Sequence, residues 1–447
     1  MIFSSISFLV LFLPITVLLY YIVPNIRFKN LILLLASLIF YGLGEPVYIL
    51  LLIGSVLVNY IVTLQMCKVQ NGKLLLAIIV TLNIAMLVFF KYISTGLALP
   101  IGISFYTFQI LSYDIDVYRD KKLIQKNFFD LLLYISFFPQ LVAGPIVKYY
   151  DISEQINSRK ASIQVIAEGL RRFAYGLGKK VLLANTIGYV VDAIYAFEPA
   201  NMNILIAWTV ALLYCLQIYY DFSGYSDMAI GLGKMFGFEF KENFCYPYMS
   251  TSIKEFWRRW HISLSTWFKE YLYIPLGGNR LGKLRTYINK YIVFFLTGLW
   301  HGANITFVIW GLIHGTFSVL EECKSFAKRL TGKIVGHIYV IRVVSVAFVF
   351  FRSDDVAMAF EIIKQMFTGF EFLTVAMIQF ISYFDGYTIF IILVGIIGVV
   401  DWKRRFEKLL KHPCVEGVVY VGSVICLIWC IFSLATNSYN PFIYFRF

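Results

Sequence analysis

Long apolar runs alternate with short polar segments along the whole chain. The runs cover residues 1–23, 30–43, 47–64, 75–90, 98–116, 128–145, 181–197, 203–220, 290–312, 334–351, 384–400 and 417–436. A helix needs about 20 apolar residues to cross a bilayer, so several of these runs are too short to span it upright. The pattern therefore predicts about 11 spans, together with tilted or re-entrant pieces.

Nothing in the sequence separates a soluble domain from these runs. No internal repeat or low-complexity tract interrupts residues 1–447, so we expect a single integral membrane domain. Segment 1–23 has no basic residue and no small-residue cleavage site, which predicts a retained span rather than a signal peptide. The predicted fold class is an all-α polytopic membrane protein.

Composition supports a membrane protein and excludes a soluble one. Hydrophobic residues make up 60% of the chain and charged residues only 15%, too few to cover a water-exposed globule. The net charge of +13 comes from basic residues clustered between apolar runs. Such clusters set topology and contact anionic head groups, so we expect membrane lipids as partners and no nucleic acid. The seven cysteines form no C-x-x-C pair, and no metal site is expected.

The first loops predict an orientation. Loops 24–29, 65–74 and 118–126 are basic, whereas the intervening loop 44–46 carries Glu45. Basic loops stay on the cytoplasmic side, which places the N-terminus outside. Past residue 150 the basic segments no longer alternate, and the orientation of later segments stays open.

The region from Tyr219 to Gly315 differs from the rest of the chain, which reads as apolar, lipid-facing helix. We take approximately 219–315 as the functional core. It carries charged groups and three of the five histidines at membrane depth or its edge, where ionisable groups are costly and typical of function. Asp221 and Asp227 lie near its beginning. We expect these aspartates to cap a helix or to hold a basic partner.

Residues Ile253–Leu272 follow helical periodicity and predict one amphipathic helix. Its apolar positions are Ile253, Phe256, Trp257, Trp260, Leu264, Trp267, Phe268 and Tyr271. Arg258 and Arg259 fall on the opposite face, and His261 falls on the boundary. An interfacial helix with snorkelling basic groups explains the stripe, but it does not explain the histidine.

A second histidine follows in Gly298-Leu-Trp-His-Gly-Ala-Asn304. A helix here would place His301 inside the membrane, and the flanking Gly298 and Gly302 would let another backbone or a substrate approach. The alternative is a core histidine satisfied by one hydrogen bond. His314 lies 13 residues further on. On a continuous helix that is about 20 Å away on another side, which predicts a structural role or a different part of a channel for His314.

Several familiar sites are absent. The sequence contains no H-E-x-x-H, and its two Gly-Leu-Gly-Lys segments do not complete a phosphate-binding loop. Ser223 and Ser226 are not part of a G-x-S-x-G elbow. The candidate chemistry that remains is proton transfer by a buried histidine, because imidazole has a pKa near the working pH.

Four segments together resemble the membrane-bound O-acyltransferase (MBOAT) family. They are Asp221-Phe-Ser-Gly-Tyr-Ser-Asp-Met-Ala-Ile-Gly231, Phe256-Trp-Arg-Arg-Trp-His-Ile-Ser-Leu-Ser-Thr-Trp267, Tyr273-Ile-Pro-Leu-Gly-Gly-Asn279 and Gly298-Leu-Trp-His-Gly-Ala-Asn304. Within the family the resemblance is closest to the bacterial alginate O-acetylation membrane subunits and their peptidoglycan and cellulose relatives. It runs from about residue 99 to 315. It implies a ring of tilted helices, with re-entrant and interfacial helices, around a central tunnel.

The resemblance also implies an activity and a location. We expect acetyl transfer from cytosolic acetyl-CoA across the bacterial cytoplasmic membrane to an extracytoplasmic polysaccharide, without a bound cofactor. A separate SGNH-type acetyltransferase outside the membrane would be the partner. Two alternatives stay open: a D-alanyl transferase for teichoic acid that uses a carrier-protein thioester, and a transporter with polar residues lining a pore.

The resemblance makes His301 the catalytic histidine and His261 the second polar position. We expect His301 to take the acceptor's proton, while His261 or Asn304 stabilises the oxyanion or positions the thioester. Arg258 and Arg259 would hold a phosphate-bearing donor or snorkel to lipid. The remaining predicted substrate-contacting residues are Trp257, Trp300 and Asp221.

Overall fold

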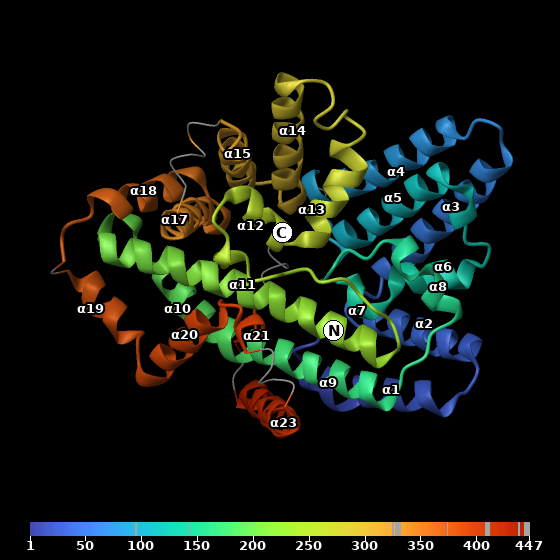
Figure 1. The fold of residues 1–447 in the computed structure, drawn as a ribbon, viewed down its shortest axis with the longest axis horizontal. Coiled ribbons are helices and arrows are strands. Elements are labelled where there is room, and N and C mark those ends of the chain that lie inside the picture. Colours follow the sequence, from blue (N-terminus) through green and yellow to red (C-terminus); the bar gives the residue numbers. More distant parts are fainter. Residues whose placement is uncertain are drawn as a thin grey trace. The chain divides into compact units, whose positions relative to one another are not determined.

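The computed structural model describes residues 1–93, 96–142, 144–323, 326, 332–372, 374–406, 412–436 and 439–441. Every regular element in these ranges is a helix, which confirms the predicted all-α class (Figure 1). The chain forms two compact units, Met1–Gly176 with Tyr225–Glu242, and Leu177–Gly224 with Asn243–Phe447. The long helix α11 (Ile204–Met235) belongs to both units. The division into units does not test whether the chain is one integral membrane domain, which stays a prediction.

The first unit is built around packed aromatic rings. Phe3 lies 5.1 Å from Phe8 and 4.6 Å from Tyr225, measured between ring centroids. Asn25 and Asn127 begin helices by accepting hydrogen bonds from backbone N–H groups two residues on. Its elements are η1 (Phe8–Phe12), α1 (Leu13–Ile22), α2 (Ile26–Gly42), α3 (Tyr48–Lys68), α4 (Lys73–Tyr92), α5 (Ile103–Arg119), η2 (Lys121–Leu123), α6 (Phe128–Ser136), α7 (Phe138–Leu141), α8 (Tyr149–Asn157) and most of α9 (Ile163–Gly178).

The second unit holds the largest part of the polar region. Its core is a single cluster of buried apolar side chains that includes Trp260, Trp310 and Phe348. Its elements are η3 (Lys179–Ala184), α10 (Asn185–Tyr195), η4 (Pro199–Asn201), the first part of α11 (Ile204–Met235), η5 (Pro247–Met249), α12 (Ile253–Arg259), α13 (Ile262–Phe268), η6 (Lys269–Tyr273), α14 (Lys283–His301), α15 (Ile305–Leu320), α17 (Lys333–Arg352), α18 (Val356–Thr368), α19 (Val375–Ser382), α20 (Gly386–Gly398), α21 (Trp402–Arg405) and α23 (Pro413–Thr436).

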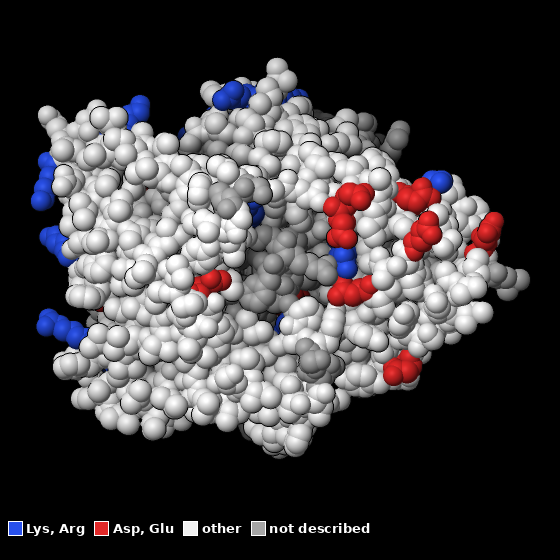
Figure 2. Space-filling view, turned by 180° about the vertical axis from the view of Figure 1, so that it is seen from behind, with Lys and Arg blue, Asp and Glu red and all other residues white. Residues whose placement is uncertain are grey.

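Five helices of the described chain are long and apolar enough to cross a membrane: α3, α4, α11, α17 and α23. The pair α19 and α20, bent by 77°, adds a sixth candidate if it forms one broken span. Only 6% of the apolar window of α23 is buried, against 67% for α11, so α23 lies mostly on the surface of the protein while α11 belongs to its interior. Figure 2 shows a face covered almost entirely by uncharged residues.

Two predicted boundaries are wrong. The apolar run 128–145 is divided into α6 and α7, because Phe137 leaves the helical conformation before Pro139. The run 203–220 continues to Met235, so Asp221 lies inside α11 and caps nothing. Its polar residues face protein rather than lipid, and this burial lets the helix extend beyond the apolar run.

Candidate functional site

Helices α14 and α15 form a hairpin whose two backbones touch. A Cβ atom on Gly298 would lie 2.4 Å from the carbonyl oxygen of Phe307, and one on Gly311 would lie 2.3 Å from that of Phe294. Real Cβ atoms do not approach backbone oxygens so closely, so only glycine permits this contact. The close approach predicted beside His301 is therefore made by another backbone, that of α15.

The hairpin corrects the continuous helix assumed between His301 and His314. His301 is the last residue of α14, Gly302 is extended, and Asn304 caps α15 by accepting a hydrogen bond from the N–H of Thr306 at 3.1 Å. The Trp310 ring lies 5.1 Å from His301 and 5.2 Å from His314 between centroids. The two histidines therefore contact the same indole rather than lying apart on one helix.

Aromatic rings enclose His301, which is 5% exposed. Trp300 lies 4.9 Å, Trp310 5.1 Å and Phe351 5.1 Å from its ring, all in edge-to-face geometry. Such walls keep bulk water from the imidazole, and they strengthen the interactions of any polar group that enters.

His261 lies at a break that corrects the predicted helix over Ile253–Leu272. Its φ of 42° is left-handed, and the chain passes from α12 to α13 at this residue. The break has a cause, because Asn243 competes for the backbone. Its Oδ1 accepts hydrogen bonds from the N–H and the hydroxyl of Ser263 at 3.1 and 2.8 Å, and its carbonyl accepts one from Ile262. A left-handed non-glycine residue is uncommon and typical of functional sites.

The side-chain amide of Asn243 also determines which ring nitrogen of His261 carries the proton. Asn243 Oδ1 lies 3.2 Å from Nδ1 of His261. Because that oxygen also accepts from the N–H of Ser263, it is an acceptor, and Nδ1 must carry the proton. Nε2 then presents a lone pair, and it is buried without a hydrogen-bond partner in the described chain. His261 lies outside the candidate spans, and burial lowers its pKa to about 3, so the ring is neutral.

One tryptophan joins the two histidines. The Trp300 ring lies 6.1 Å from His261 and 4.9 Å from His301 between centroids. Trp257 joins the same group through Trp310, at 5.7 Å. The structure thus brings together four residues that the sequence singled out: His261, His301, Trp300 and Trp257. Their roles toward a substrate stay predictions.

Two other residues singled out by the sequence, Asp221 and Asn304, form polar contacts within the protein. The carboxylate of Asp221 lies 2.6 Å from the Lys180 ammonium, and both side chains are buried, which confirms the predicted basic partner. Asn304 caps α15, and its amide donates to the carbonyl of Asp354. Direct contact of Asp221 or Asn304 with a substrate stays a prediction.

The two arginines of α12 differ. Arg259 pairs with Glu255 at 2.8 Å, four residues earlier on the same helix. Arg258 is exposed. The structure leaves both interpretations of Arg258 open, the phosphate of a donor and the phosphates of lipid.

Sequence reasoning missed three residues of the site. Asn243 lies outside every motif, Trp310 lies in an uninterrupted apolar run, and Phe351 lies 50 residues beyond His301. The contacts of these three residues depend on tertiary packing and leave no local signal.

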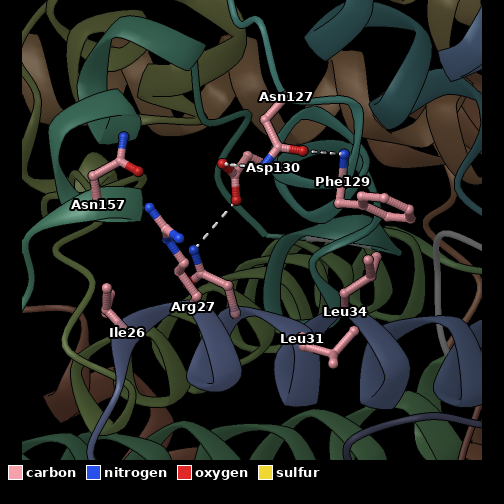
Figure 3. Close-up of a pocket in the computed structure, with 9 residues that line it drawn as sticks. Ile26, Arg27, Leu31, Leu34, Asn127, Phe129, Asp130 and Asn157 are labelled. Atoms are coloured by element: carbon pink, nitrogen blue, oxygen red, sulfur yellow. Dashed lines mark hydrogen bonds between the residues drawn. The ribbon is translucent and has the colours of Figure 1, made fainter.

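The first unit contains a pocket with several polar side chains in its lining. Its lining residues lie between positions 26 and 157, before the histidines in the chain. It has a volume of about 560 Å³ and is lined by Arg27, Asn30, Asn127, Asp130 and Asn157 over an apolar floor (Figure 3). Asp130 accepts hydrogen bonds from Asn30 at 3.3 Å and from Asn127 at 2.9 Å, so the fold itself uses these polar groups. Among the described residues, no group of three His, Cys, Asp or Glu side chains could hold a metal ion.

The described chain thus combines helices of spanning length with two buried histidines that contact the same indole. Residues 119–351 match the membrane-bound O-acyltransferase family, and the chain belongs to this family. It is therefore a multi-pass membrane acyltransferase, as the sequence motifs predicted.

Three relatives illustrate the breadth of the family. A probable alginate O-acetylase AlgI of Pseudomonas syringae is 42% identical over 82% of this chain and 75% of its own length. A peptidoglycan O-acetyltransferase of Helicobacter pylori is 36% identical over 82% of this chain and 80% of its own. A teichoic acid D-alanyltransferase of Bacillus subtilis is 28% identical over 52% of this chain and 60% of its own.

Proposed function

We propose that this protein transfers an acetyl group from cytosolic acetyl-CoA, through the bacterial cytoplasmic membrane, for O-acetylation of an extracytoplasmic polysaccharide. The observation that carries the proposal is the pair of buried histidines, His261 and His301, joined by Trp300. A hydroxyl attacks a thioester readily only when a base accepts its proton, and a buried imidazole is suited to that task.

His301 acts as the general base in this proposal. It accepts the proton of the attacking hydroxyl, the oxygen bonds to the thioester carbon, the carbon–sulfur bond breaks, and the thiol leaves with the proton. His261 has a more specific role than the sequence suggested. With its proton on Nδ1, its Nε2 accepts a hydrogen bond from a second hydroxyl of the acceptor and so orients the acceptor, while the attacking hydroxyl gives its only proton to His301. An oxyanion would need a donor at Nε2 instead.

The acetyl donor and a polysaccharide acceptor are supported by the relatives. The relatives that cover 82% of this chain, at 36–43% identity, are named as O-acetylating enzymes of alginate and peptidoglycan. The D-alanyltransferase is more distant and covers 52%, so D-alanyl transfer is the second candidate. An extracytoplasmic SGNH-type enzyme that receives the acetyl group belongs to the first proposal.

The test is the identity of the ester in living cells. The gene is deleted, and the strain is complemented with the full chain or with an empty vector. Mild base then releases the acyl groups from the envelope polymers for mass analysis. The proposal expects acetate that disappears with the gene. Released D-alanine in place of acetate would favour the second candidate. An ester content that does not depend on the gene would contradict both candidates.

A further inference from the structure

Four polar atoms of the second unit are buried with nothing to bond. They are Nε1 of Trp257, Nε1 of Trp310, and both ring nitrogens of His314, none of which has a hydrogen-bond partner in the described chain. Native proteins pair nearly all buried polar atoms with protein or water, and exceptions need an explanation. His314 and Trp310 are 0% and 1% exposed, so bulk water does not supply the missing partners.

The three side chains form one cluster. Their ring centroids lie 5.3 Å apart for Trp257 and His314, 5.2 Å for Trp310 and His314, and 5.7 Å for the two tryptophans. The Trp310 ring also contacts His301. Trp310 therefore connects the cluster to His301, and a packing role alone would not require a polar ring at position 314.

The chemistry of these atoms selects a ligand. Each indole is a donor only, and a neutral imidazole is one donor and one acceptor, so the cluster offers three N–H groups and one lone pair. A secondary amide matches three of these four groups, because its oxygen accepts two hydrogen bonds and its N–H donates one. The Phe256 ring stacks on His314 at 5.9 Å and an interplanar angle of 3°, a wall that suits a flat neutral group. A sugar carries many hydroxyls and would leave most of them unpaired there.

We propose that Trp257, Trp310 and His314 form an amide-binding cluster that holds a secondary amide of the acyl donor's thioester arm beside His301. This inference rests on the proposed function, which supplies a thioester donor. The phosphopantetheine arm carries such amides both in coenzyme A and on a carrier protein, so the cluster recognises chemistry that the two donors share. His314 is then a positioning residue and takes no part in proton transfer.

The test compares binding with stability in the full chain held in lipid nanodiscs. The probe is S-acetonyl-CoA, a stable ketone analogue of acetyl-CoA, and calorimetry gives its Kd. His314→Leu removes both unpaired nitrogens. It should raise the Kd about tenfold or more while leaving the melting temperature unchanged or higher, because a buried unpaired group is lost. Binding of the probe by His314→Leu as tight as by wild type would overturn the inference.

Two further variants keep the test decisive. Trp257→Phe deletes one unpaired N–H and should weaken binding several-fold even if His314→Leu does not fold. Trp208→Phe is the matched control, because its indole donates to the carbonyl of Met366 at 2.8 Å. It should lower the melting temperature and leave the Kd unchanged. Equal loss of affinity in Trp208→Phe and Trp257→Phe would also overturn the inference.

A second arm identifies the source of the amide and separates the two proposals. The same acetonyl group is presented on phosphopantetheine attached to a carrier protein. The donor that wild type binds more tightly is the natural source, and His314→Leu should weaken both by a similar factor. Failure of wild type to bind either probe would contradict the proposed function itself, whereas equal binding by wild type and His314→Leu contradicts only the cluster.

Discussion

A single amide decides what His261 can do. Asn243 Oδ1 accepts from Ser263 and so compels Nδ1 of His261 to donate, which leaves the lone pair on Nε2. Without that acceptor the imidazole proton would be free to move to Nε2, and the ring would present a donor instead. In the proposed mechanism, the orientation of a substrate hydroxyl thus depends on a residue 18 positions away from the histidine.

Asn243→Leu should reduce polymer acetylation about tenfold or more, the usual cost of removing the partner of a buried hydrogen bond. Asn243→Asp keeps an acceptor at the same place and should retain most of the activity. Ester content per unit of membrane-inserted protein measures both. Equal activity in the two variants would show that Asn243 does not set the proton on His261.

Asp221 tests whether a predicted substrate residue is structural. In Asp221→Asn the buried Lys180 ammonium keeps its hydrogen bonds to Asn185 and Pro441 but loses its opposite charge. We expect about 3–5 kcal/mol less stability. The double variant Asp221→Leu with Lys180→Met removes both charges and should recover most of the melting temperature. If the double variant melts like wild type but transfers no acetyl group, Asp221 or Lys180 has a direct role in transfer.

At the scale of elements, two helix boundaries create the site. His261 directly precedes α13 and His301 is the last residue of α14, so each histidine lies at the end of a helix rather than in its middle. Helix ends present side chains that regular turns do not surround. Periodicity predicted helices in both places correctly but could not find the breaks, because Asn243 and Asn304 impose them through side-chain hydrogen bonds.

The glycine contact of the hairpin gives a prediction at this scale. Gly298→Ala would force a Cβ atom against the Phe307 carbonyl, so α14 and α15 must separate. We expect a loss of at least about 2 kcal/mol and little acetyl transfer, as for other overpacked contacts. The control is Gly54→Ala in α3, where nothing lies within 4 Å. A melting curve of each solubilised variant measures the loss of stability. Equal stability of Gly298→Ala and Gly54→Ala would contradict the close packing of α14 and α15.

For the whole molecule, the sequence predicted the class and the helical fold correctly, because these depend on composition, periodicity and motif. It also singled out the two histidines that the structure brings together, and their catalytic role stays a prediction. It did not predict the contacts made by Trp310 and Phe351, because those side chains come from apolar segments that look like lipid-facing helix. The predicted central tunnel and the full number of spans are properties of the assembled chain in its membrane and stay predictions.

Orientation in the membrane is predicted by the early loops. Alkaline phosphatase, which is active only outside the cytoplasm, should be active when fused at residue 45 and inactive when fused at 70 or 122. A green fluorescent protein fusion gives the opposite pattern as a control. Phosphatase activity at 122 would reverse the proposed direction of transfer, because the donor could no longer reach the expected side.

The central claim is that His301 is the base for acyl transfer. The direct measurement is polymer-bound acetate in a deletion strain that expresses wild type, His301→Ala or His314→Leu at equal membrane levels. A missing general base commonly costs about 10²–10⁴-fold in rate, so His301→Ala should give no acetate above the empty vector, while His314→Leu keeps a reduced amount. Normal acetate in a well-expressed His301→Ala strain would contradict the account and favour a transporter.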